Sequence, residues 1–168
     1  MNNFALALLT LVLLVLQSAA VPRMDIGGAR ANLLLVFVVF LGLYARRQQA
    51  VIAGLAIGLA ADLLTIEQLG LLTASYGLAA AMVVSMREYL FRYRTTTQFV
   101  LTLFVSAALN VCWLAYRRAA YGAVEVWYES FLAMASSLYT AAWAPIMDAT
   151  LLRAAGLIGM QRQRPRFR

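Results

Sequence analysis

The sequence predicts an all-α membrane protein with six transmembrane helices in one domain. Of its 168 residues, 64% are hydrophobic and only 12% are charged, and the mean hydropathy is +0.79. A water-soluble domain of this size could not expose so much apolar surface without aggregating. Apolar runs recur along the whole length, and no polar block is long enough to fold separately. We therefore expect one membrane domain over residues 1–158 and a basic cytoplasmic tail over residues 159–168.

Six apolar runs give the expected spans. The first run has 18 residues without a charge, and as a helix it would reach roughly 27 Å, close to the thickness of the bilayer core. The second run is short, but tilted neighbours can absorb the mismatch. The sixth run contains Pro145, which predicts a kink. The spans expected are about 4–21, 30–45, 50–66, 69–86, 95–116 and 130–152.

The first run could instead be a signal peptide, because Ser18, Ala19 and Ala20 resemble a small-residue cleavage site. Two features argue against cleavage. Residues 1–3 carry no positive charge, and the run is longer than a usual signal-peptide core. We therefore expect the first span to be retained.

The third and fourth runs should form a tight antiparallel hairpin. Only the brief polar turn at Glu67 and Gln68 separates them, so the fourth run must fold straight back along the third.

The distribution of charge predicts orientation. The net charge is +7, and all fourteen basic residues are arginines. Ten of them fall in the segments 46–49, 87–94 and 153–168, against four in the segments on the other side. Because positive loops stay in the cytoplasm, we expect a multi-pass protein of the bacterial inner membrane with both termini cytoplasmic. The same distribution argues against nucleic-acid binding. The basic and aromatic segment 87–94 is instead expected to contact membrane lipids.

The composition excludes several classes of enzyme. The chain has no histidine and one cysteine, Cys112, so histidine relays, cysteine metal clusters and Ser-His triads are absent. It also lacks a phosphate-binding P-loop, a dinucleotide fingerprint and a nucleophile elbow. We expect no catalytic residue, cofactor or metal.

The third run carries Gly54, Gly58 and Asp62 at four-residue spacing, and Gly70 follows the turn. Four residues are just over one helical turn, so the first three share a face. Small residues let another helix approach closely in lipid, whereas a carboxylate there needs a partner. We expect these four residues to form a helix-packing or partner-binding face.

Two further polar groupings are expected inside the spans. Asp62, Tyr76 and Asn110 fall at similar depths near the outer leaflet and could form a polar cluster. Such a cluster could hold a ligand or partner, or it could be a hydrogen-bonded clamp that closes the hairpin. Asp148, near the inner end of the sixth run, is expected to form an ion pair with Arg153.

The third span reads Gly58-x-x-x-Asp62 and continues to Leu69-Gly70-Leu71, in a chain with six short spans and an arginine-rich tail. In these features the chain resembles the rod shape-determining protein MreD family. Two positions depart from the family pattern. Ala31 and Asn32 stand where a proline often begins the second span, and Thr65 follows Asp62-Leu63-Leu64 where a glycine is usual.

The resemblance implies a non-enzymatic member of the bacterial elongation machinery that helps maintain cell shape. It implies binding to MreC, an indirect link to the filament protein MreB and to the synthase pair of RodA and a penicillin-binding protein, and a role in organising peptidoglycan synthesis. It also implies a fold similar to the substrate-binding subunits of energy-coupling factor transporters. That fold supplies the alternative function, a membrane subunit that captures a small molecule for a transporter.

Overall fold

The computed structural model is all-helical over the residues that it describes, which are 3–19, 21–25, 27–64, 70–87, 95–122 and 126–158. The expected polar turn at 67–68 and the tail at 159–168 lie outside this part. The described chain contains six α-helices and a short 3-10 helix, and no strand. These elements are α1 (Asn3–Ala19), η1 (Val21–Met24), α2 (Leu33–Tyr44), α3 (Arg47–Asp62), α4 (Leu71–Met86), α5 (Thr95–Tyr121) and α6 (Val126–Ile158). The expected all-α class is therefore confirmed.

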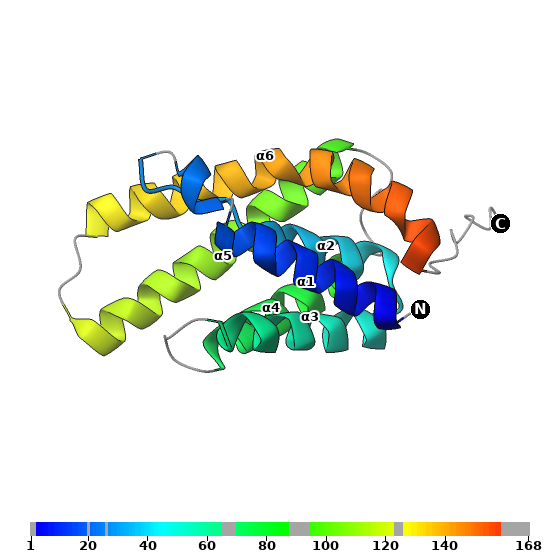
Figure 1. Cartoon of the computed structure of the whole chain (residues 1–168). Coiled ribbons are helices and arrows are strands. Elements are labelled where there is room, and N and C mark those ends of the chain that lie inside the picture. The colour runs from blue at the N-terminus through cyan, green and yellow to red at the C-terminus, as the bar shows by residue number, and fades with distance from the viewer. Residues whose placement is uncertain are drawn as a thin grey trace.

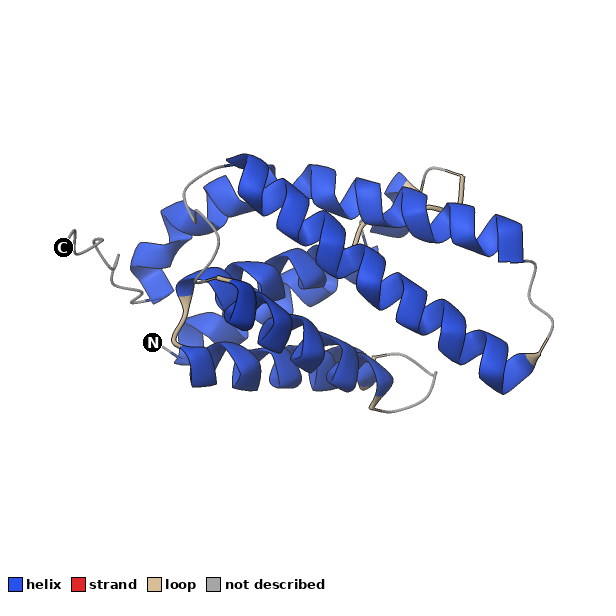
Figure 2. Cartoon of the chain, turned by 180° about the vertical axis from the view of Figure 1, so that it is seen from behind, coloured by secondary structure: helices blue, strands red, loops and turns tan. Residues whose placement is uncertain are grey.

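The helices run back and forth along one axis. Figure 1 shows the start of α1 and the end of α6 at the same end of the bundle, together with the connection from α2 to α3. The end of α3, the beginning of α4, the end of α5 and the beginning of α6 lie at the opposite end, which the reverse view confirms (Figure 2). We call the end of the bundle where α5 ends and α6 begins the distal end. Successive helices are therefore antiparallel, and α3 and α4 form the expected hairpin, with extensive contact between them.

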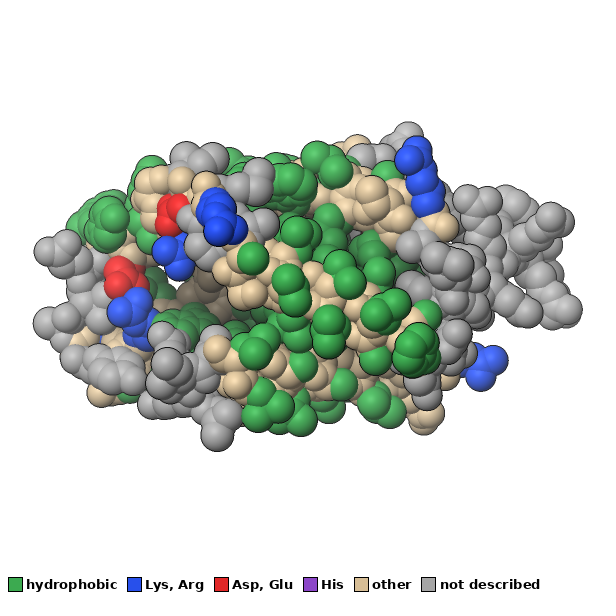
Figure 3. All heavy atoms as spheres, viewed as in Figure 1, with side chains coloured by type: hydrophobic (Ala, Val, Ile, Leu, Met, Phe, Trp, Pro, Cys, Tyr) green, Lys and Arg blue, Asp and Glu red, His purple; other side chains and the backbone are tan. Residues whose placement is uncertain are grey.

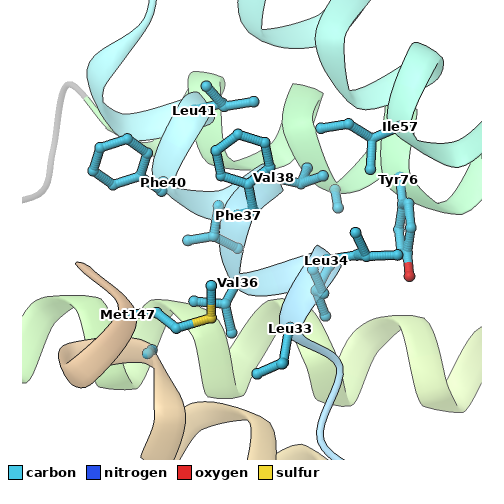
Figure 4. Close-up of a cluster of buried hydrophobic side chains, with 14 of the residues drawn as sticks. Leu33, Leu34, Val36, Phe37, Val38, Phe40, Leu41, Ile57, Tyr76 and Met147 are labelled. Carbon is cyan, nitrogen blue, oxygen red and sulfur yellow. The ribbon is translucent and has the colours of Figure 1, made fainter. Parts of the chain in front are cut away.

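The short helix α2 is the centre of the bundle. It contacts α1, α3, α4, α5 and α6, and every residue from Leu33 to Leu43 is buried. Figure 4 shows Phe37 and Phe40 of α2 among side chains that include Met147 of α6. A helix that is apolar on all sides is stable only where it is enclosed. Here the other helices enclose it, so the apolar character of α2 reflects a protein core.

Helix lengths differ from the expected spans. Helix α2 begins only at Leu33 because Asn32 is its N-cap, with the Asn32 side-chain oxygen accepting a 3.0 Å hydrogen bond from the N–H of Leu35. Its 12 residues extend roughly 18 Å, less than the bilayer core. Among the described helices, only α5, over Thr96–Ala120, is long and apolar enough to cross a membrane by length and composition. Of the six expected spans, one therefore corresponds to a described helix that meets this criterion.

The exterior of the bundle is strongly apolar. Figure 3 shows hydrophobic side chains over much of the face in view. Large hydrophobic side chains are exposed on α1, α3, α5 and α6, among them Phe4, Leu11, Ile52, Phe104 and Phe131. Exposed apolar surface on this scale indicates contact with lipid or with another protein.

Candidate functional site

Asp62 joins the end of α3 to the beginning of α4. Its side chain is buried, with 1% exposure. The carboxylate accepts hydrogen bonds from the backbone N–H groups of Gly70 (3.0 Å), Leu72 (3.0 Å) and Thr73 (2.9 Å), and from the Thr73 hydroxyl (2.6 Å). The first N–H groups of a helix have no partner within the helix, and they attract negative charge. Asp62 therefore caps α4 from the preceding helix, and these four donors stabilise its negative charge.

The glycine face of α3 packs against α4. A Cβ atom on Gly58 would lie 2.5 Å from the Cα of Thr73 and 2.7 Å from the carbonyl oxygen of Leu72. A Cβ atom on Gly54 would lie 2.9 Å from the carbonyl oxygen of Tyr76. Both contacts involve backbone, which cannot move aside as a flexible side chain can. The structure places this face inside the chain, where no partner protein could reach it.

Gly70 has a different role from the other two glycines. It is the N-cap of α4, with a φ of 100° in the left-handed region, and nothing lies within 4 Å of a Cβ placed on it. Glycine is favoured there because other residues rarely adopt that backbone conformation. The grouping of Gly70 with the packing face is corrected accordingly: it turns the chain into α4, and its N–H reaches Asp62.

The expected cluster of Asp62, Tyr76 and Asn110 is not formed. The Tyr76 hydroxyl donates a 3.0 Å hydrogen bond to Oδ1 of Asn32. The side-chain amide of Asn110 donates to the carbonyl oxygen of Ala133 (3.2 Å) and to the Ser137 hydroxyl (2.8 Å). Tyr76 and Asn110 line one cavity, and Asp62 does not line it. Similar depth along the bundle was not enough to predict contact, because Asp62 turns toward α4.

The cavity that contains Tyr76 and Asn110 lies toward the distal end and has a volume of about 420 Å³. We call it the polar cavity. Its walls come from α4, α5 and α6, from the end of α1 and from the connection into α2. The polar side chains that line it are Gln17, Arg30, Asn32, Ser75, Tyr76, Ser106, Asn110, Trp113, Ser136 and Thr140. A concave site with convergent polar groups among apolar ones has the character of a binding pocket.

Polar side chains also fix the connection between α1 and α2 that forms one wall of this cavity. Gln17 donates to the carbonyl oxygen of Ala31 (3.1 Å) and accepts from the N–H of Leu33 (2.8 Å). The N–H of Asn32 donates to the Thr140 hydroxyl at 3.0 Å, which ties the connection to α6. These residues were not among the site residues expected from the sequence. A polar residue inside an apolar run, such as Gln17, was the available signal.

Asp148 does not form the expected ion pair with Arg153. It is buried, with 5% exposure, and its Oδ2 lies 3.5 Å from the Tyr44 hydroxyl, which accepts a 2.9 Å hydrogen bond from Gln98. Arg153 is exposed. Five residues along a helix rotate the side chain by roughly 140°, so the two point to different sides. The ion pairs among the described residues join Arg30 to Asp25 and Arg117 to Glu129.

The described residues contain no group of three or more acidic, cysteine or histidine side chains that could hold a metal ion. The model of the rod shape-determining protein MreD family matches residues 1–151 of the 168-residue chain. The chain belongs to the MreD family. The family is membrane-associated and determines rod shape, and it is not known as an enzyme family.

Neither a curated protein nor a solved structure matches the chain. The similarity to transporter substrate-binding subunits that the family resemblance implied therefore has no support, and neither has the alternative function of small-molecule capture for a transporter. What MreD membership and the geometry establish together is a helical, shape-determining membrane protein whose glycine face serves its own fold.

Proposed function

We propose that the chain is a non-enzymatic, multi-pass component of the bacterial elongation complex, located in the inner membrane, where it binds MreC. Through MreC it associates with MreB and with the RodA and penicillin-binding protein synthase pair, and it helps organise peptidoglycan synthesis. The observation that carries this proposal is the family match over residues 1–151, which covers every described helix except the end of α6.

The arrangement of the helices supports six membrane crossings. Successive helices reverse direction, and the beginning of α1 and the end of α6 lie at one end of the bundle (Figure 1). That end also carries Arg46 and Arg47, the N-cap and the first residue of α3. Short helices such as α2 can belong to a membrane domain because their ends are enclosed by protein. The arginine excess would place this end in the cytoplasm.

Topology can be tested with single cysteines introduced after Cys112 is replaced by serine. Arg47 and Arg118 lie at opposite ends of the bundle and are both exposed. We expect Arg118→Cys to react with a membrane-impermeant maleimide in spheroplasts, whose inner membrane is intact. Arg47→Cys should react only after the inner membrane is permeabilised. Equal labelling of both positions in intact spheroplasts would contradict the proposed topology.

We expect the partner surface on the apolar exterior, because the glycine face is already occupied by α4. The exposed side chains Leu11 on α1, Ile52 on α3, Phe104 on α5 and Phe131 on α6 lie on four different helices. A photo-crosslinking amino acid at each position, in cells that express MreC, should yield an MreC adduct from at least one side. The buried position Val38 provides the control, since it should give none.

Co-purification of MreC with the unmodified chain tests the proposal directly. If MreC fails to co-purify and no exposed position crosslinks to it, the proposed partnership is wrong. A matched pair of α3 variants separates partner binding from folding. Gly58→Leu should unfold the hairpin and lose MreC together with stability, whereas Ala56→Leu places the same side chain on the exposed side of α3.

A further inference from the structure

The polar cavity takes no part in the proposed scaffold function, and its α5 wall carries three polar residues on one side of the helix. Ser106, Asn110 and Trp113 follow one another at four-residue and three-residue spacing and all line the cavity. Residues at these spacings lie on one helix face. Polar groups that line one face of a helix are energetically unfavourable in a membrane, so such a row indicates a functional site.

Each of these three residues has a polar atom for which the described residues provide no hydrogen-bond partner. Asn110 uses its amide nitrogen to hold α6, through Ala133 and Ser137, and its carbonyl oxygen makes no hydrogen bond to the described residues. The hydroxyl of Ser106 and the indole N–H of Trp113 likewise make none within the described chain. Ser106 is only 3% exposed. The wall therefore offers an acceptor, a donor and a hydroxyl that can do either.

The charges at the edge of the cavity cancel in pairs. Arg30 lies 3.0 Å from Asp25, and Arg117 lies 2.8 Å from Glu129. The Arg117 guanidinium also lies over the Trp113 ring, 5.5 Å from its centre. A charged ligand would enter such a site without a free countercharge, and desolvation would then oppose binding. The lining favours an uncharged ligand that carries both hydrogen-bond donors and acceptors.

The cavity extends sideways between α5 and α6. A second cavity of about 180 Å³ shares Asn110, Trp113 and Ser136 with the first and is bounded by residues of these two helices. Figure 3 shows a hollow at this end of the bundle, with side chains of both charges beside it. The outer sides of α5 and α6 expose Phe104 and Phe131, which would face lipid. A ligand with a polar head and an apolar tail could therefore place the head inside and leave the tail in the bilayer.

We propose that the polar cavity binds the uncharged sugar headgroup of a membrane lipid, with Ser106, Asn110 and Trp113 as its polar contacts. A sugar supplies many hydroxyl groups and an apolar ring face, which match the hydroxyl and amide lining and the indole. The volume of about 420 Å³ is within the usual range for ligand pockets. The proposal rests on the membrane location proposed above, but not on MreC binding.

Binding can be measured by native mass spectrometry on the full chain released from nanodiscs. The nanodiscs contain phosphatidylcholine with one added probe, either glucosyl diacylglycerol or phosphatidylglycerol. We expect one retained glucosyl lipid per chain and no comparable retention of phosphatidylglycerol. Trp113→Phe keeps the aromatic packing and removes one donor, and Ser106→Ala removes one hydroxyl. Each should weaken retention of the glucosyl lipid about 3-fold to 10-fold, as expected for one hydrogen bond.

Ser85→Ala is the matched control, because Ser85 is an exposed serine on α4 outside the cavity. It should retain the glucosyl lipid as the unmodified chain does. Equal retention of all added lipids, or equal retention by Ser106→Ala, Trp113→Phe and Ser85→Ala, would overturn the proposal. Methyl glucoside that bound as tightly as the glucosyl lipid would overturn the lipid assignment. An MreC crosslink from inside the cavity would show a protein occupant instead, and failure of MreC to co-purify would count only against the scaffold function.

Discussion

The Thr73 hydroxyl donates a 2.6 Å hydrogen bond to Oδ2 of Asp62, and the backbone N–H of Thr73 donates a second one, of 2.9 Å, to the same oxygen. One residue of α4 thus binds the last residue of α3 through both its side chain and its backbone. Together with the glycine contacts below it, this pairing closes the α3–α4 hairpin at its distal end. The sequence indicated the Asp62 carboxylate as a possible binding group, but its hydrogen-bond donors come from the chain itself.

Replacing Asp62 should destabilise the fold. Asp62→Ala leaves the N–H groups at the start of α4 without their acceptor in a buried place, which should lower the free energy of unfolding by about 1–3 kcal/mol. Thr73→Val should cost less, because the backbone donors keep Asp62. The thermal unfolding midpoint of the purified chain in detergent measures both effects. A midpoint for Asp62→Ala equal to that of the surface variant Gln48→Ala, at an exposed position of α3, would contradict the capping role.

Adding a side chain at Gly58 should also destabilise the fold. A Cβ atom there would lie 2.5 Å from the Cα of Thr73, so Gly58→Ala must push α3 and α4 apart and should cost about 1–3 kcal/mol. Ala56→Gly supplies a comparison on the exposed side of the same helix, where only the helix propensity of about 1 kcal/mol is lost. Unfolding midpoints and expression levels of the two variants can be compared directly. If Gly58→Ala were as stable as the unmodified chain, the close approach of the two helices would be wrong.

Much of the fold was predictable from the sequence, because apolar runs reflect burial in helices. The all-α class and the α3–α4 hairpin followed from run length and from the short turn. The N-terminal boundary of α2 could not be predicted in this way, because it depends on the hydrogen bond through which Asn32 caps the helix, and the length of an apolar run does not show that contact. The central position of α2 was also hidden, since a buried core helix and a lipid-facing span have the same composition.

The candidate site was less predictable. Spacing correctly placed Gly54, Gly58 and Asp62 on one face, but it could not distinguish packing within the chain from packing against a partner. Depth placed Asp62 near Asn110, yet the direction of a side chain around its helix decides contact, and that direction depends on how the helices are rotated. The residues tied to Asn32, among them Thr140 and Tyr76, are far from it in sequence. Their contacts arise only from the fold.

The contacts of Asp148 predict different effects on stability for substitutions at Tyr44 and at Arg153. Tyr44→Phe removes the hydroxyl that lies between Gln98 and Asp148, and it should cost about 1 kcal/mol for each hydrogen bond lost. Arg153→Gln should change stability by less than about 0.5 kcal/mol, as for most surface substitutions. Thermal unfolding in detergent measures both. A larger loss of stability for Arg153→Gln than for Tyr44→Phe would contradict this description and would support the ion pair between Asp148 and Arg153.

The connection between η1 and α2 should show a defined dependence on pH. Arg30 donates a 3.0 Å hydrogen bond to one oxygen of Asp25, and the N–H of Gly28 donates a 2.6 Å hydrogen bond to the other. These two bonds, the Arg30 bond first, lower the pKa of Asp25 below its usual value of 3.8. Both stabilise the charged carboxylate, so the connection is fully held at pH values above the ordinary pKa.

As the pH falls through the lowered pKa of Asp25, protonation removes the charge and these contacts weaken. Arg30→Gln removes the larger cause, so it should move the pKa of Asp25 upward toward the usual value, while the contact with Gly28 keeps part of the shift. The carboxyl carbon chemical shift of Asp25, followed by NMR in detergent micelles, gives the pKa of both forms. Raising the salt concentration should shift the pKa of the unmodified chain in the same direction, because exposed charge pairs are screened. Identical titration of the two forms would show that Arg30 does not act on Asp25.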